Sequence, residues 1–181
     1  MKKKFLLITS VALLCVSLFG CKNKKEEKIL SNIDAATEAD MVDYTALSSN
    51  DNFAEISYDT LASCIGNEKV NAIIYMGYPA CDNCQSAIKD IQDAAIAAEQ
   101  TVYYFNVSKA IDTDEDYDRI IELLSPVLKA DDTNADELAI YTPHIFLIID
   151  GQLVQGHVGY TEDYDYSKLM DINTIKKEIS E

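Results

Sequence analysis

The ten residues YMGYPACDNC, at positions 75–84, carry the strongest indication of how this chain folds. The apolar run that ends at Met76 is typical of a buried strand, and Gly77 and Pro79 end that strand. Two cysteines follow, three positions apart, where a helical pattern begins. Free backbone amides at a helix N-terminus favour a thiolate, which is the reactive form of cysteine. The stretch therefore predicts a strand, a tight turn and a dithiol at the start of a helix.

The two cysteines of this dithiol have different expected roles. Cys81 stands at the start of the helix and is the candidate nucleophile that attacks or accepts a substrate sulfur. Cys84 lies one turn further on, is expected to face inward, and would resolve the mixed disulfide. No separate cofactor is expected, because a reversible Cys81–Cys84 disulfide is itself the redox group.

The first twenty residues have the pattern of a secretion signal. Lysines at positions 2–4 precede an apolar segment, residues 5–20, that is shorter than the ~20 residues a membrane span needs. The sequence LFGC at 18–21 resembles the lipobox of bacterial lipoproteins. The resemblance implies cleavage before Cys21, lipid on its sulfur, and an extracytoplasmic protein anchored to the cell membrane by that lipid. An uncleaved anchor or a plain secretion signal is the alternative.

The chain is strongly acidic. With 31 acidic and 15 basic residues its formal charge is −16, and removal of the three signal lysines would bring it to −19. Nucleic-acid phosphates need basic contacts, so nucleic acid is not an expected partner. Solubility is the simpler explanation of the charge, and attraction of cationic substrates is the other.

Three of the five cysteines remain in the expected mature domain, since Cys15 lies in the signal and Cys21 would carry lipid. An odd number argues against a scaffold held together by disulfides. Cys64 shares a helical face with Leu61 and Ile65, which predicts a buried thiol that contributes packing. The close pair is then the redox site, and disulfides persist outside the cytosol.

Residues 21–40 lack sustained apolar periodicity and are expected to form a flexible tether. The domain would span residues 41–181, with its core from about residue 53 and an unassigned strand or loop over residues 41–52. The patterns in that core predict strands at residues 53–57, 70–76 and 101–107, and a hairpin with strands at 145–149 and 153–158. They also predict a helix to about residue 65, the dithiol helix to about residue 100, a helix around 120–128 that is kinked or divided at Pro126, and a helix over residues 172–179.

This order of elements resembles the thioredoxin fold over about residues 53–181. The resemblance rests on the cysteine spacing together with Thr142–Pro143 before a strand, an Asp-Gly hairpin turn and Gly159. It implies an α/β fold of three layers, with a central mixed β-sheet flanked by helices. It also implies that a cis Pro143 packs beside the dithiol and that Thr142 binds the substrate chain. An ordinary trans proline at the start of an edge strand is the alternative.

Two positions depart from the pattern of that family. Tyr75 stands where the family has a buried acid, and Tyr104 where it has a nearby lysine. Loss of only one partner would leave a buried charge unpaired, so the joint replacement is physically coherent. The carboxylate expected to take a proton from Cys84 is therefore absent, and a water molecule or another acid would have to serve.

The sequence thus predicts a membrane-tethered thiol-disulfide oxidoreductase that acts on protein or peptide thiols and disulfides. A redox partner in the membrane or outside the cytoplasm is implied, and the direction of electron transfer stays open. On residues 77–81 and the lipobox, the chain is similar to bacteriocin transport accessory proteins and related extracytoplasmic oxidoreductases. The alternative is a non-catalytic lipoprotein of the same fold that holds a peptide or another protein in the Thr142–Pro143 groove.

Two histidines leave further alternatives. A structural zinc site could use the dithiol with two of Cys64, His144 and His157. No second close pair of ligands is present, so we do not expect a metal site. His144, next to the proline, could instead face the dithiol and stabilise a thiolate. Both histidines are more simply strand residues.

Overall fold

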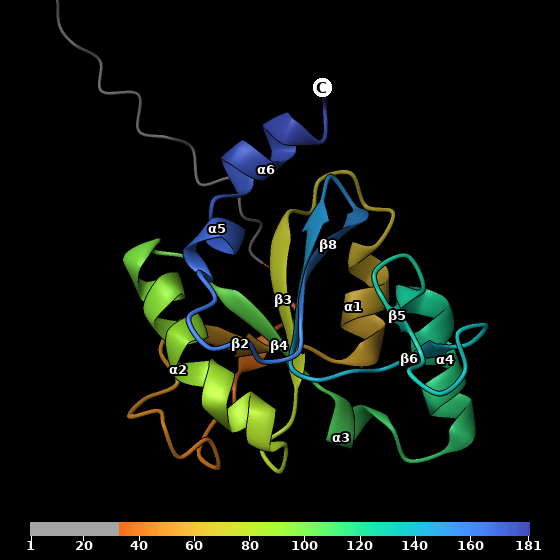
Figure 1. Ribbon diagram of the computed structural model, residues 1–181. Coiled ribbons are helices and arrows are strands. Elements are labelled where there is room, and N and C mark those ends of the chain that lie inside the picture. Colours follow the sequence, from red (N-terminus) through yellow and green to blue (C-terminus); the bar gives the residue numbers. More distant parts are fainter. Residues whose placement is uncertain (1–32) are drawn as a thin grey trace, which may run out of the picture.

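The computed structural model describes residues 33–181, which form an α/β structure around a central mixed sheet of six strands (Figure 1). Helices cover both faces of the sheet, so the predicted fold class is confirmed. The strands of this sheet are β1 (Thr37–Glu38), β2 (Phe53–Glu55), β3 (Ala72–Gly77), β4 (Val102–Asn106), β7 (His144–Ile149) and β8 (Gln152–Val158). The helices of the described residues are α1 (Tyr58–Cys64), α2 (Asp82–Ala97), α3 (Val107–Ala110), α4 (Asp114–Leu124), α5 (Ser167–Met170) and α6 (Ile172–Glu178).

The strand order, β1-β2-β4-β3-β7-β8, places β3 in the interior of the sheet. β2, β4 and β3 are parallel to one another, and the chain connects them through α1 and α2. Parallel neighbours require such crossovers, as the alternating pattern predicts. β7 and β8 form an antiparallel hairpin that pairs with the other side of β3. The strand that ends at the dithiol therefore has a hydrogen-bonded neighbour along each edge.

All six residues of β3 are buried, because both faces of the sheet are covered. Successive side chains of a strand point to opposite faces. Ile73 and Tyr75 belong to the core cluster that includes α2, α5 and α6, whereas Ile74 and Met76 belong to the cluster that includes α1 and α4. A continuous apolar run of this kind is typical of a central strand whose two faces are both covered, and not of an edge strand.

The helix expected around residues 120–128, kinked or divided at Pro126, ends before the proline instead. α4 ends at Leu124, and the amides of Val127 and Leu128 bond back to the carbonyl of Leu124 in a turn. Proline has no amide proton for the next helical bond, and its ring collides with the preceding turn. Pro126 therefore ends the helix, and residues 129–139 continue into a small separate sheet of β5 (Lys129–Ala130) and β6 (Leu138–Ala139).

The predicted hairpin between β7 and β8 is confirmed, including its turn. Asp150 and Gly151 both have positive φ, 50° and 74°, as a type I′ turn requires. Gly151 also lies against the backbone of Asn67, and a Cβ at this glycine would be 2.6 Å from it. The turn is therefore packed onto the loop that follows α1.

The packed structure begins earlier in the chain than predicted. Residues 33–40 fall within the expected tether, yet Thr37–Glu38 forms β1 at the edge of the sheet and Ile33 and Ala39 are buried. The loop that follows, residues 41–52, contributes the fully buried Tyr44 to the core. A two-residue strand and isolated apolar side chains have no periodicity, which is why no pattern indicated them.

The expected signal, Cys21 and the first part of the expected tether lie outside the described residues. Within residues 33–181, no helix combines the length and the apolarity needed to cross a membrane.

Two glycines with positive φ provide a matched test of this packing. We expect Gly159→Ala, with φ of 84° and no neighbour within 4 Å, to lose about 1 kcal/mol of unfolding free energy through backbone strain alone. Gly151→Ala should lose at least about 1 kcal/mol more, because its Cβ would overlap Asn67. Urea unfolding of both variants measures the difference. Equal losses would contradict the close packing of the turn.

Candidate active site

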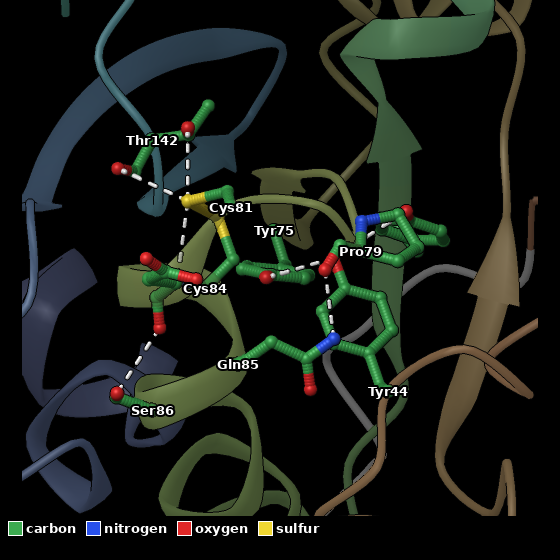
Figure 2. The surroundings of a disulfide bond; sticks show 10 residues. Tyr44, Tyr75, Pro79, Cys81, Cys84, Gln85, Ser86 and Thr142 are labelled. Carbon is green, nitrogen blue, oxygen red and sulfur yellow. Dashed lines mark hydrogen bonds between the residues drawn. A yellow bond between two sulfur atoms is a disulfide. The ribbon is translucent and has the colours of Figure 1, made fainter.

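Cys81 and Cys84 form a disulfide at the start of α2, with their Cα atoms 5.1 Å apart (Figure 2). Cys81 is the N-cap residue of the helix and is partly exposed, whereas Cys84 is completely buried. Asp82 and Asn83, between them, are exposed. Of the two cysteines, only Cys81 is therefore accessible from solvent.

The first turn of α2 directs a backbone amide at this exposed sulfur. The amide of Cys84 donates a hydrogen bond to Cys81 Sγ at 3.1 Å. An N-cap normally uses an oxygen to accept this bond, and here a sulfur takes that place. A thiolate on Cys81 would keep the bond and would lie at the positive end of the helix dipole. The geometry thus favours the anionic form of the partly exposed cysteine.

Thr142 and Pro143 lie beside the dithiol, although they are about sixty residues away in the sequence. Thr142 Oγ1 donates to Cys81 Sγ at 3.4 Å, and the carbonyl oxygen of Thr142 lies 3.7 Å from the same sulfur. The Thr142–Pro143 peptide bond is cis, as the resemblance implies. The antiparallel pairing of β3 with β7, in which Met76 faces His144, brings the two segments together.

Three buried tyrosines lie on the inner side of the site. Tyr75 and Tyr104 are register partners on β3 and β4, and their rings stack with centroids 5.6 Å apart. Tyr44 adds a third ring from the loop before β2. Burial raises the pKa of all three hydroxyls above the ordinary value of 10. We call these residues the tyrosine cluster, and it stays uncharged at neutral pH.

Gln85 is a site residue that the sequence did not indicate. Its Nε2 donates to the carbonyl oxygen of Pro79 at 2.7 Å (Figure 2). The same Nε2 donates to the carbonyl oxygen of Asp43 at 2.8 Å, and Oε1 accepts from the amide of Thr45 at 3.0 Å. One side chain thereby connects the loop before Cys81 to the segment before β2. In the sequence Gln85 has the appearance of any polar residue on a helix surface.

The possibility that His144 faces the dithiol is not supported. His144 pairs with Met76 and its ring contacts Phe146, so it belongs to the sheet face opposite the tyrosine cluster and Cys84. Burial, helped by the charge of Lys129, lowers its pKa to about 4. A neutral imidazole on the far face cannot stabilise a thiolate electrostatically.

The zinc alternative requires ligands that the structure keeps apart. Cys64 is buried and unbridged, as predicted, and it belongs to the core cluster on the face opposite Cys84. His157 stacks on Tyr164 with centroids 3.6 Å apart. Within residues 33–181, no group of three or more His, Cys, Asp or Glu side chains is arranged to bind a metal ion.

No family model matches the sequence, and no curated protein matches it either. The geometry of the site, a disulfide at a helix N-terminus, fits thiol-disulfide exchange.

Because His144 is buried, we expect the free energy of unfolding to decrease in weak acid. The unfolded chain binds a proton at the ordinary pKa of 6.5, whereas the folded chain does so only near 4, so stability falls as pH drops from about 6.5 to 4. We expect His144→Leu to make this decrease in unfolding free energy smaller by about 2–3 kcal/mol, as the size of the pKa shift indicates. Urea unfolding at pH 7, 5.5 and 4.5 measures the slope. An unchanged slope would show that His144 does not cause it.

Proposed function

We propose that this protein is a membrane-tethered, extracytoplasmic thiol-disulfide oxidoreductase with a thioredoxin-like fold. The observation that carries the proposal is the asymmetric dithiol: a partly exposed Cys81 at a helix N-terminus, bridged to a buried Cys84 and covered by Thr142. The lipid anchor on Cys21 and the extracytoplasmic location rest on the lipobox pattern alone. The proposed substrates are thiols and disulfides of proteins or peptides.

The thioredoxin-like assignment is supported by features that lie far apart in the chain. A parallel strand–helix–strand unit carries the dithiol at the start of its helix, and an antiparallel hairpin preceded by a cis-proline follows. The proline segment then contacts the exposed sulfur, where the resemblance implies a site for the substrate chain. A two-cysteine motif without that segment would support the assignment less.

The exchange reaction needs only the two sulfurs. A substrate thiolate attacks Cys81 Sγ, the Cys81–Cys84 bond breaks, and its electron pair leaves on Cys84, which takes up a proton. A second substrate thiolate then attacks the substrate sulfur of the mixed disulfide and displaces Cys81, so the protein dithiol is reduced and the substrate dithiol is oxidised. The same steps in reverse reduce a substrate disulfide. The relative potentials of the two couples decide the net direction.

Cysteine variants test this function directly. We expect Cys81→Ser to abolish exchange with glutathione and with a dithiol, because the accessible sulfur is lost. Cys84→Ser should accumulate a mixed disulfide on Cys81, detectable by intact mass, because the resolving thiol is lost. Cys64→Ser is the matched control and should retain exchange, since Cys64 is buried on the opposite face. A Cys81–Cys84 pair inert to glutathione in both directions would instead indicate a non-catalytic binding protein.

The proposed anchoring has a separate test. We expect the native chain, expressed in a bacterium that processes lipoproteins, to fractionate with membranes and to carry lipid mass on Cys21. Cys21→Ser should move the folded domain to the soluble fraction, because the thioether site is gone. Membrane association that survives this change would show that the chain is retained in another way.

A further inference from the structure

The proposed chemistry leaves a proton that no acidic side chain is placed to handle. Cys84 is completely buried, and it must lose a proton each time it attacks a mixed disulfide. None of the Asp and Glu side chains within residues 33–181 is buried, so none lies beside this sulfur in the core. A path for the proton must therefore be built from other groups.

The hydroxyl of Tyr75 lies next to the buried sulfur. Gly77 ends β3 between these two groups, and a Cβ on this glycine would be 2.5 Å from Tyr75 Oη and 3.2 Å from Cys84 Sγ. The oxygen and the sulfur therefore border one small space that Gly77 leaves free of any side chain. Figure 2 shows Tyr75 beside Cys84, with its hydroxyl directed to that of Tyr44.

The three hydroxyls form one continuous chain with a defined direction. Tyr44 donates its hydroxyl proton to Tyr104 Oη at 3.4 Å, so at the 3.1 Å contact with Tyr75 it must accept. Tyr75 therefore donates to Tyr44, and Tyr44 donates to Tyr104. Each donor points away from Cys84, which is the orientation needed to carry a proton out from the sulfur.

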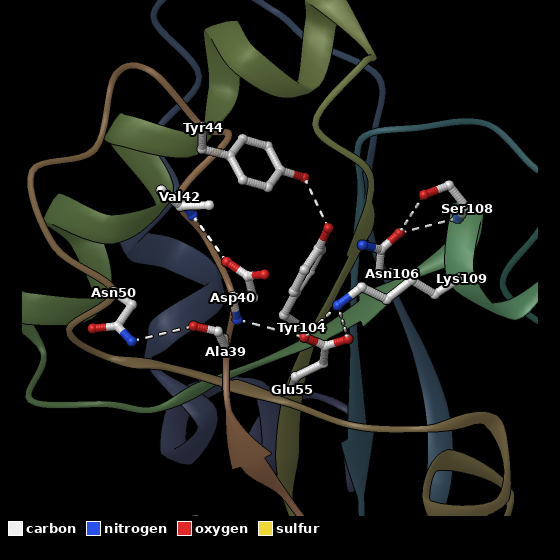
Figure 3. Close-up of polar contacts among 10 residues, drawn as sticks. All are labelled: Ala39, Asp40, Val42, Tyr44, Asn50, Glu55, Tyr104, Asn106, Ser108 and Lys109. Carbon is white, nitrogen blue, oxygen red and sulfur yellow. Dashed lines mark hydrogen bonds and ion pairs between the residues drawn. The ribbon is translucent and has the colours of Figure 1, made fainter.

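Carboxylates at the edge of the sheet lie near Tyr104, the last tyrosine of this chain. Tyr104 is the register partner of Glu55 on β2, so the two side chains share a face. In Figure 3 the Tyr104 hydroxyl points to that of Tyr44, and the carboxylates of Glu55 and Asp40 lie near the Tyr104 ring. Burial raises the pKa of Tyr104 most, Tyr44 raises it next, and the two carboxylates raise it further. Glu55 is only partly buried and also pairs with Lys109 at 2.8 Å, so this end is open to solvent.

We propose that Tyr75, Tyr44 and Tyr104 conduct the proton of Cys84 between the buried sulfur and the carboxylates at the β2 edge. This inference rests on the proposed exchange function. Tyr75 takes the proton of the Cys84 thiol as the sulfur attacks Cys81, while Tyr75 passes its own proton to Tyr44 and Tyr44 to Tyr104. Tyr104 passes its proton, by way of water, to the carboxylates at the edge.

Atoms and electrons balance in this step. The electron pair of Cys84 forms the bond to Cys81, the bond from Cys81 to the substrate sulfur breaks, and the leaving substrate thiolate takes a proton from solvent. In the reverse reaction Cys84 leaves as a thiolate and receives its proton through the same three hydroxyls, each turned the other way. Since burial keeps the tyrosines neutral, the chain passes a proton without storing a charge. Outside the tyrosine cluster, the titratable group that raises the pKa of Tyr75 is Tyr166, which burial also keeps neutral.

The test isolates the resolution step. The reduced full chain is mixed with dithiobis(nitrobenzoate), and the second release of thionitrobenzoate, the phase missing from Cys84→Ala, reports the attack by Cys84. We expect Tyr75→Phe to slow this phase roughly 100-fold at pH 7, the lower end for a placed acid–base group. The native rate divided by the Tyr75→Phe rate should fall toward 1 above pH 9, where hydroxide deprotonates the thiol without the relay.

Two further variants make the test specific to the chain. Tyr44→Phe, which removes the second hydroxyl, should slow the same phase, and the Tyr44→Phe/Tyr75→Phe double variant should be no slower than the slower single variant, because the groups act in series. Tyr103→Phe is the matched control. Tyr103 neighbours Tyr104 on β4 and is also buried, but its hydroxyl accepts from the amide of Ile33 on the other face. Its rate should equal that of the native protein.

The possible outcomes decide between the proposals. Native rates in both Tyr75→Phe and Tyr44→Phe would overturn the relay and leave the exchange function intact. Equal slowing in all three phenylalanine variants, or a deficit in Tyr75→Phe that is constant from pH 6 to 10, would also overturn it, since a merely structural defect has that signature. A native protein with no second phase at all would overturn the exchange function itself. Should Tyr75→Phe fail to fold, Tyr44→Phe alone decides by the same pH profile.

Discussion

The burial of β3 on both faces and along both edges is the constraint on which the rest of the structure depends. Because this strand pairs with β4 on one side and β7 on the other, its end at Gly77 has a fixed position relative to both neighbours. The dithiol follows within a few residues, and Thr142 precedes the strand that pairs antiparallel with β3. Two loops that are individually irregular are thereby held within hydrogen-bond distance of each other across the site.

The tyrosine cluster shows how a core can avoid a buried charge near a reactive sulfur. A buried ion pair stabilises a core only when both partners and all their hydrogen bonds are in place. Three hydroxyls that bond to one another satisfy their polar atoms without any charge to desolvate. The arrangement requires Tyr44, which comes from a loop outside the strands and helices. The polar interior of the site is thus completed by the segment that leads into the sheet.

Local sequence patterns predicted much of the fold, and the features that they did not predict have a common cause. Apolar runs, helical periodicity and the Asp-Gly turn indicated α1, α2, β3, β4 and the hairpin, because each is determined by neighbours in the sequence. β1, the contribution of Tyr44 and the bridging role of Gln85 were not indicated. Each depends on a contact between segments some 15 to 60 residues apart, which leaves no regular spacing in the sequence.

The sequence by itself determined the local features of the candidate site: the cysteine spacing, the strand and helix that flank it, and the absence of an acid or lysine at positions 75 and 104. Local geometry is enough for these, since a CxxC at a helix start has its reactivity set by the helix end. Only the tertiary structure decided which groups surround the two sulfurs. It placed Thr142 against Cys81, moved His144 to the opposite face and put Tyr75 beside Cys84. Strand pairing and core packing control those positions, and both act between residues that are distant in the chain.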